Sequence, residues 1–229
     1  MHNDRERPIR DIQQNSAAGR VVVISILWAL FHSLLASRAA KQYVHRLTGT
    51  RIRNGFYRFM YVIQSVVTVG WGTVWFLRQP DRELYHIPPP WSWLLRTVQL
   101  SSLAMLFSAI RVIGYGRFLG LRQVRDLLCG YMPVPEPEAQ GPPLTEYGTI
   151  DARGPFKVIR HPDNLPVFGV LWFFPRMTMN RLVLATVLSA YAIVGSLHED
   201  SRLRTAYGNA FEQYEQIVPF LLPRWRRHL

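Results

Sequence analysis

Hydrophobic residues in this chain are gathered into long uncharged blocks rather than spread evenly along it. Residues 21–36, 59–77 and 182–197 contain no charged side chain, and residues 91–113 contain only two arginines, one near each end. Blocks of roughly 16–23 apolar residues have the length of a helix that crosses the hydrocarbon core of a membrane. The pattern therefore predicts an all-α, polytopic integral membrane helical bundle.

A further apolar segment, residues 165–174, is too short to span a membrane alone. Pro162 and Pro166 lie at its start, which favours a tilted half-span followed by a return through residues 182–197. We therefore expect about five membrane helices, of which the last two form a C-terminal helical hairpin. Because prolines leave backbone groups unsatisfied, we also expect a protein-covered or wet cavity near Pro162.

Composition divides the chain into four regions. Residues 1–17 are charged and predict a flexible N-terminal arm, and residues 18–130 hold the first three membrane helices and a glycine-punctuated stretch that predicts a short interfacial helix. Residues 131–151 are rich in proline and predict an irregular loop. Residues 152–229 hold the hairpin and a C-terminal helix, which the spacing of its apolar residues predicts to begin near Glu199.

The net charge of +12 is distributed unevenly between the loops. The loop between the first two blocks has six basic residues and no acidic one, whereas the charges of the next loop cancel. Alternation of this kind follows the positive-inside rule, and it explains the charge better than a nucleic-acid-binding groove does. We expect no nucleic-acid partner, and we expect a bacterial inner membrane location with the C-terminus in the cytoplasm and membrane lipids as neighbours.

Polar residues bracket the predicted hairpin. The stretches Gly154–Phe156 and Arg160–Asn164 precede it, and Glu199 and Asp200 follow it. Taken alone, each group has an ordinary explanation, since acids at a helix N-terminus compensate the helix dipole. A hairpin that returns to one membrane face would nevertheless bring Arg160, His161 and Glu199 together. That meeting of charges beside an apolar hairpin favours a membrane enzyme that binds a polar cofactor at the interface.

These motifs resemble the isoprenylcysteine carboxyl methyltransferase superfamily, whose pattern is shared with phospholipid methyltransferases. The sequence is most similar to the branch that contains methanethiol S-methyltransferases, nurim-like proteins and NnrU-type proteins. Gly-Pro-Phe before Arg-His-Pro, and Asn two residues after it, carry the resemblance. The His32–Ser37 stretch and Tyr57-Arg58 are also similar to that branch.

The resemblance implies an S-adenosylmethionine-dependent methyltransferase with a lipophilic small-molecule acceptor, or a thiol or carboxylate acceptor. Arg160 and His161 would hold the carboxylate of the cofactor, and Glu199 would accept hydrogen bonds from its ribose or ammonium group, so Arg160 and Glu199 are the expected catalytic residues. No metal ion is implied. The residues expected to bind the cofactor are Gly154, Pro155, Phe156, Arg160, His161, Pro162, Asn164, Glu199 and Asp200.

Two other classes of function remain open from the sequence. The NnrU-type branch is also similar to the zeta-carotene isomerase family, which uses haem, and His32 and His161 are the candidate axial ligands. A non-catalytic membrane protein that keeps the fold as a scaffold is the other alternative. The only cysteine, Cys129, excludes an internal disulfide and a cysteine metal cluster.

Overall fold

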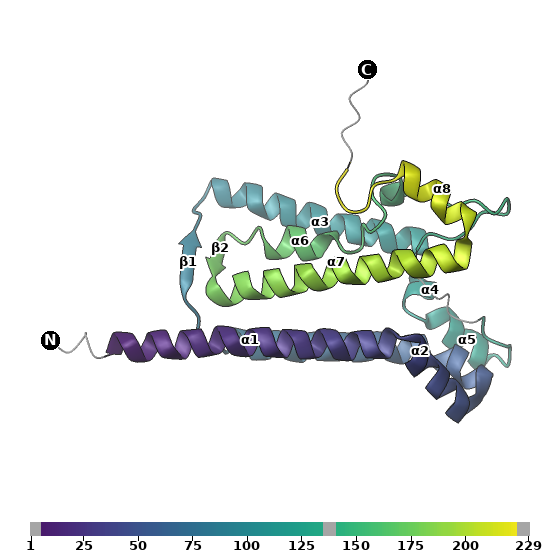
Figure 1. Cartoon of the computed structure of the whole chain (residues 1–229), viewed down its shortest axis with the longest axis horizontal. Coiled ribbons are helices and arrows are strands. Elements are labelled where there is room, and N and C mark those ends of the chain that lie inside the picture. The colour runs from purple at the N-terminus through teal and green to yellow at the C-terminus, as the bar shows by residue number, and fades with distance from the viewer. Residues whose placement is uncertain (1–5, 135–140, 224–229) are drawn as a thin grey trace, which may run out of the picture.

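The computed structural model describes residues 6–134 and 141–223, and it is almost entirely helical (Figure 1). Within these residues, four helices are long and apolar enough to cross a membrane. They are α1 (Glu6–Ala36), α2 (Arg38–Leu77), α3 (Trp91–Ile113) and α7 (Met179–Tyr207). The predicted all-α polytopic membrane bundle is confirmed.

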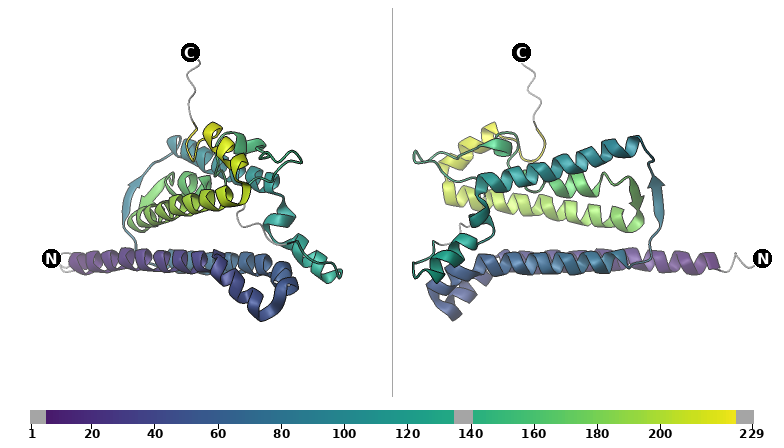
Figure 2. Two further views of the ribbon diagram at one scale, coloured as in Figure 1. Left: turned by 45° about the vertical axis from the view of Figure 1, so that its right-hand side comes forward. Right: turned by 180° about the vertical axis from the view of Figure 1, so that it is seen from behind.

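Helices α1 and α2 pack against each other as one layer of the molecule (Figures 1 and 2). Ser37 separates them, and its hydroxyl caps α2 by accepting a hydrogen bond from the backbone N–H of Ala40. Inside α2 the helix is broken at Gly49, whose φ of 76° lies in the left-handed region that glycine tolerates best. The basic residues before the second predicted span therefore form a bent, helical corner instead of an open loop.

Helices α3, α6 (Leu165–Leu171) and α7 form the second layer, which meets the first where α7 packs on α1 (Figure 1). The contact between α3 and α6 is unusually close. A Cβ atom at Gly169 would lie 1.7 Å from the Ser102 hydroxyl, so only glycine allows this approach. This close contact with α3 stabilises α6, because a helix of so few turns is not stable alone.

The hairpin consists of one short and one long helix. Residues 165–174 contribute the seven-residue α6, with Pro166 in its first turn, where proline is tolerated. The chain continues without helix through Pro175 to β2 (Arg176–Thr178), so four of the five predicted segments are helices of spanning length. Figure 1 shows α6 and α7 running in opposite directions side by side, as expected of the hairpin.

A small antiparallel sheet closes the end of the bundle where the hairpin turns. Strand β1 (Glu83–His86) precedes α3 and pairs with β2. Backbone hydrogen bonds from Met179 to Arg82 and from Ile87 to Pro175 extend the pairing on both sides. The loop between α2 and α3 is therefore joined to the turn between α6 and α7 (Figure 1).

At the opposite end, α7 continues past Glu199 to Tyr207, and α8 (Asn209–Ile217) begins after Gly208. The prediction that a helix begins near Glu199 is wrong, because the sequence from Leu182 to Tyr207 contains no residue that stops a helix. Glu199 and Asp200 consequently have no role in compensating a helix N-terminus. Apolar residues from both sides of Gly208 pack together across the corner between α7 and α8: Leu203, Tyr207, Phe211, Tyr214 and Val218.

The remaining predicted regions differ in detail. The chain is helical from Glu6, so residues 6–17 begin α1 instead of forming an irregular arm, and residues 1–5 lie outside the described residues. The predicted interfacial helix is two short helices, α4 (Tyr115–Phe118) and α5 (Leu121–Leu128). The described parts of the proline-rich loop, 131–134 and 141–151, contain no helix.

Candidate functional site

An ion-pair cluster lies where the segment before α6 meets the last turns of α7. The Asp200 carboxylate accepts hydrogen bonds from Arg160 Nη2 and from His161 Nε2, each at 2.8 Å. All three side chains are at least nine-tenths buried. Residues about forty positions apart in sequence are thus brought together by the hairpin.

Arg160 also fastens the segment that follows α8. Its Nη1 donates to the backbone oxygens of Glu215 and Val218, and its backbone N–H donates to the oxygen of Pro219 at 2.9 Å. Its guanidinium faces the ring of Phe220 at 5.7 Å, which is within the range of a cation–π contact. Arg160 therefore ties α7, through Asp200, to the chain beyond α8.

Glu199 lies on the open side of the cluster. Its carboxylate is 3.5 Å from His161 Nδ1, and 22% of its side chain is exposed. Asp163, two residues after His161, has its pKa raised to about 6 by burial and by the negative charge of Glu199. Two carboxylates thus sit close enough to repel each other, an arrangement that a cationic ligand would stabilise.

Four carboxylates gather at the cluster, those of Asp163, Glu199, Asp200 and Glu215. The cationic side chains of Arg160, His161 and Arg204 lie among them. Arg204 is at the rim, where it contacts Glu215 at 2.6 Å. Arg160 Nε is buried and has no hydrogen-bond partner within residues 6–134 and 141–223. The site therefore combines several acidic groups with a donor of Arg160 that none of these residues uses.

The charge of His161 makes the site sensitive to pH. Burial alone would lower the pKa of this imidazole, but the hydrogen bonds to Asp200 and Glu199 outweigh it and raise the pKa to about 9. Because the folded-state pKa is above the ordinary 6.5, His161 contributes its full stabilisation below about pH 6.5 and loses it as the pH rises through about 9. We expect the difference in thermal unfolding midpoint between wild type and His161→Asn to shrink across that window. A difference that grows with pH would contradict this assignment.

The other predicted site residues differ in what they contact. Phe156, in the 3₁₀ helix η1 (Gly154–Lys157), packs against Ala109 and Ile113 of α3, and its backbone oxygen accepts a hydrogen bond from the Tyr214 hydroxyl. Gly154 turns the chain into η1 with a φ of 55°. Pro155 and Pro162 are buried, and Asn164 Nδ2 donates to Ser196 Oγ at 2.8 Å. These residues hold the segment in place, and Arg160, His161, Glu199 and Asp200 supply its charge.

Sequence reasoning missed three members of the cluster. Asp163 lies inside the motif that was singled out, and a carboxylate beside Arg-His-Pro was a usable signal. Glu215 and Phe220 had no such signal, because only the turn after Tyr207 folds them back onto Arg160. Phe220 also contacts the His161 ring edge-on, with 5.2 Å between ring centroids.

The two histidines proposed as haem ligands lie in different surroundings. His161 has a carboxylate beside each ring nitrogen. His32, in α1, contacts the Tyr61 hydroxyl and Ser65 Oγ of α2 instead. The structure does not bring these imidazoles together as a pair, which disfavours the haem alternative.

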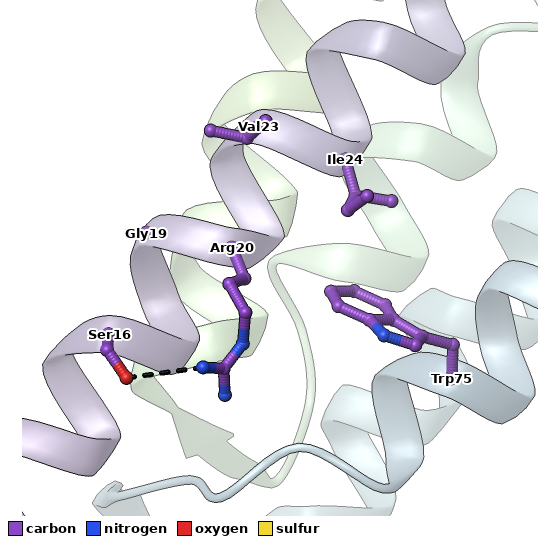
Figure 3. A pocket seen from close by; sticks show the side chains of 6 residues that line it. All are labelled: Ser16, Gly19, Arg20, Val23, Ile24 and Trp75. Carbon is purple, nitrogen blue, oxygen red and sulfur yellow. Dashed lines mark hydrogen bonds between the residues drawn. The ribbon is translucent and has the colours of Figure 1, made fainter.

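An open groove lies far from the cluster, between the N-terminal half of α1 and the end of α2 (Figure 3). Its volume is about 550 Å³, and Arg20, Ile24 and Trp75 face it. The Arg20 guanidinium donates to Ser16 Oγ and to Gln79 Oε1. The groove is at the end where β1 and β2 pair, so it has no part in the charged site.

The chain is similar to known proteins over most of its length. The chain is 27% identical over 221 residues to methanethiol S-methyltransferase 1 of Bradyrhizobium diazoefficiens, covering 93% of this chain and 70% of the relative. It is 27% identical to methanethiol S-methyltransferase of Mycobacterium tuberculosis, covering 92% and 81%, and 27% identical to nurim of Xenopus laevis, covering 80% and 61%. The predicted resemblance is confirmed.

These relatives support a membrane methyltransferase. The similarity extends over both layers of the bundle and includes the charged site at the end of α7. No family model matches the chain, and no solved structure matches it. The roles of the site residues therefore follow from their own contacts and charges.

Proposed function

We propose that this protein is an S-adenosylmethionine-dependent methyltransferase whose cofactor binds at the charged cluster and whose acceptor is a small thiol or another lipophilic molecule. The observation that carries the proposal is the pair of neighbouring carboxylates, Glu199 and Asp163, beside a buried guanidinium. This pair lies at the end of an apolar hairpin, where a polar cofactor would bind next to an apolar acceptor.

The residues present suit the charges of this cofactor. S-Adenosylmethionine has a sulfonium and an ammonium group, for which Glu199 and Asp163 supply negative charge. Its carboxylate would be matched by the unpartnered Nε of Arg160. The other hydrogen-bonded nitrogens, Nη1 and Nη2 of Arg160 and Nε2 of His161, donate to protein oxygens. They therefore position Asp200 and the segment after α8.

Methyl transfer is an in-line displacement, so most of the catalysis lies in holding two partners in line. When bound, the cofactor supplies an activated methyl group. Glu199 would bind it, Arg160 would orient it, and Phe220 and the segment from Val218 would exclude water. The residues that sequence similarity suggested as catalytic, Arg160 and Glu199, are thus binding and orienting groups in this proposal.

The acceptor class rests on the relatives, which are named for methanethiol. A small thiol is apolar enough to enter from the lipid, and the partly exposed apolar faces of the spanning helices are open to it. We expect purified protein in detergent to bind S-adenosylmethionine in a calorimetric titration and to methylate methanethiol. A sample that binds no cofactor but shows a Soret band would instead support the haem alternative.

We further propose that the charged site faces the cytoplasm, since the basic corner of α2 lies at the same end of the bundle (Figure 1). The single cysteine, Cys129, is exposed after α5 at this end and provides a native probe. We expect a membrane-impermeant maleimide to label it in inverted vesicles and not in intact cells. A Cys129→Ser, Leu84→Cys variant has its cysteine on β1, at the other end, and should be labelled in intact cells and not in inverted vesicles. Labelling of Cys129 in intact cells would show that the charged site faces the outside.

A further inference from the structure

A second polar cluster lies between the two layers, nearer the middle of α7 than the charged site is. It is built around His32, which lies one turn before the end of α1. Its other members are half-buried or partly exposed aromatic and hydroxyl side chains from three helices. They are Trp28 and Ser33 of α1, Tyr61 and Ser65 of α2, and Tyr191 of α7.

The hydrogen bonds of this cluster define the tautomer of His32. Ser65 Oγ donates to the backbone oxygen of Tyr61 at 2.7 Å, so its remaining capacity toward His32 Nδ1, 3.4 Å away, is to accept. Nδ1 therefore carries the proton. Nε2 then accepts a hydrogen bond from the Tyr61 hydroxyl at 2.6 Å, a short distance for a neutral pair. The imidazole is oriented to receive a proton from Tyr61.

Arg58 and Trp28 act on the charges that such a transfer would create, and Arg58 acts in both directions, because its positive charge favours a tyrosinate but opposes a positive charge on His32. The Arg58 guanidinium lies over the Tyr61 ring at 5.5 Å, where its positive charge favours a tyrosine oxygen that is gaining negative charge. Its Nε donates to the backbone oxygen of Phe118 at 2.7 Å, which fixes it there. The Trp28 ring stacks on His32 with 5.0 Å between centroids, a contact that favours an imidazolium over a neutral ring.

The cluster is within reach of the charged site. Tyr191 faces His32 and Trp28, and Glu199 lies eight residues later on the same helix, which is about 12 Å along the helix axis. His32 lies toward the end of α1 that is nearest the charged site (Figure 1). A cofactor held at Glu199 would have to extend along α7 toward Tyr191 to meet an acceptor beside this cluster.

A thiol acceptor needs a base, because the thiolate and not the thiol is the nucleophile. We propose that Tyr61 and His32 form a proton relay that binds and deprotonates the thiol acceptor, an inference that rests on the proposed function. The acceptor S–H bond breaks as its proton passes to Tyr61 Oη, and the hydroxyl proton of Tyr61 passes to His32 Nε2. The electron pair of the S–H bond stays on sulfur, so the products are a thiolate and an imidazolium, whose extra proton later returns to solvent.

The experiment compares two acceptors of different acidity, an alkanethiol that is mostly protonated at neutral pH and an aromatic thiol that is mostly ionised. With the alkanethiol, Tyr61→Phe and His32→Asn should lose on the order of a hundredfold or more in kcat/KM, the usual contribution of a general base. With the aromatic thiol the loss should be under about tenfold, since no proton has to be removed. Equal losses with both thiols, or no loss, would overturn the relay.

Tyr57→Phe is the matched control, because the Tyr57 hydroxyl lies one turn earlier on α2 and donates to the backbone oxygen of Leu35. It should keep the wild-type ratio of activities toward the two thiols. If His32→Asn does not fold, the milder Tyr61→Phe change decides the question, and calorimetric affinity for S-adenosylmethionine should stay at the wild-type value.

A second measurement separates this inference from the proposed function. Added alkanethiol should produce the ultraviolet absorbance of a thiolate in cofactor-free wild type and not in His32→Asn. Wild type that shows this absorbance but binds no S-adenosylmethionine would keep the relay and overturn the proposed cofactor. Wild type that methylates thiols but shows no thiolate absorbance and no acidity-dependent loss in the variants would overturn the relay alone.

Discussion

Replacing Asp200 by alanine should lower the free energy of unfolding by about 3–5 kcal/mol, the expected cost of removing one partner from a buried ion pair. The Asp200 carboxylate is the shared acceptor of Arg160 and His161, and its side chain is only 6% exposed. Without it a buried guanidinium keeps its charge but loses its counter-ion, and the segment after α8 loses its anchor. Thermal and denaturant unfolding in one detergent measure the change.

Asp151→Ala is the matched control for this change. Asp151 pairs with Arg153, whose side chain is 68% exposed, so the same substitution there should cost under about 1 kcal/mol. Equal destabilisation by the two variants would show that the buried pairing at Asp200 has no special role. A stable Asp200→Ala protein would have the same meaning.

Glu199→Gln should weaken binding of S-adenosylmethionine by about ten- to hundredfold while leaving the protein folded. The change keeps the size of the side chain and removes its charge, so the proposed contact to the cofactor loses a charge-assisted hydrogen bond worth roughly 1.5–3 kcal/mol. Since 22% of the Glu199 side chain is exposed, the effect on stability should be far smaller than at Asp200. Titration calorimetry of wild type and variant in the same detergent measures the affinity.

Glu212→Gln provides the comparison, because Glu212 is an exposed carboxylate of α8 near the same end of the molecule. Its affinity for the cofactor should equal that of wild type. Unchanged affinity in folded Glu199→Gln would leave the proposed cofactor site without its main chemical support. If haem were present instead, its content should not respond to Glu199→Gln, since this side chain is not one of the candidate axial ligands.

The membrane architecture could be predicted because length and charge act on whole segments. The apolar blocks of spanning length form α1, α2, α3 and α7. The shorter segment 165–174, which is bounded by prolines, contains the short helix α6. Helix boundaries inside polar sequence were harder to locate. The acidic pair at Glu199 resembled a helix start, yet packing on α6 and α1 carries α7 straight through it to Tyr207.

The charged site was predicted in part for the same reason. A hairpin has to bring its two ends together, so topology predicted that Glu199 meets the Arg160-His161 segment, and its carboxylate lies 3.5 Å from His161 Nδ1. The position of Asp200 as the shared partner of Arg160 and His161 was not predicted. Which atoms pair did not follow from topology, because this depends on the turn at Gly208 that returns Glu215 and Val218 to Arg160. The sequence therefore indicated the residue types of the charged cluster. It assigned Arg160 to the cofactor, whereas most hydrogen-bond donors of Arg160 bind protein oxygens.

The two layers are joined at both ends of the bundle. At one end, the sheet formed by β1 and β2 and the side chain of Asn180, which donates to the Pro80 oxygen, join the connection after α2 to the start of α7. At the other end, α4 and α5 connect α3 to α2, and Arg58 donates to the Phe118 oxygen there. Toward this end, the link between α1 and α7 includes the side-chain contact of Ser33 with Tyr191. Because both ends are joined, a guest from the bilayer would have to reach the His32 cluster through the side of the bundle and not through an opening at either end.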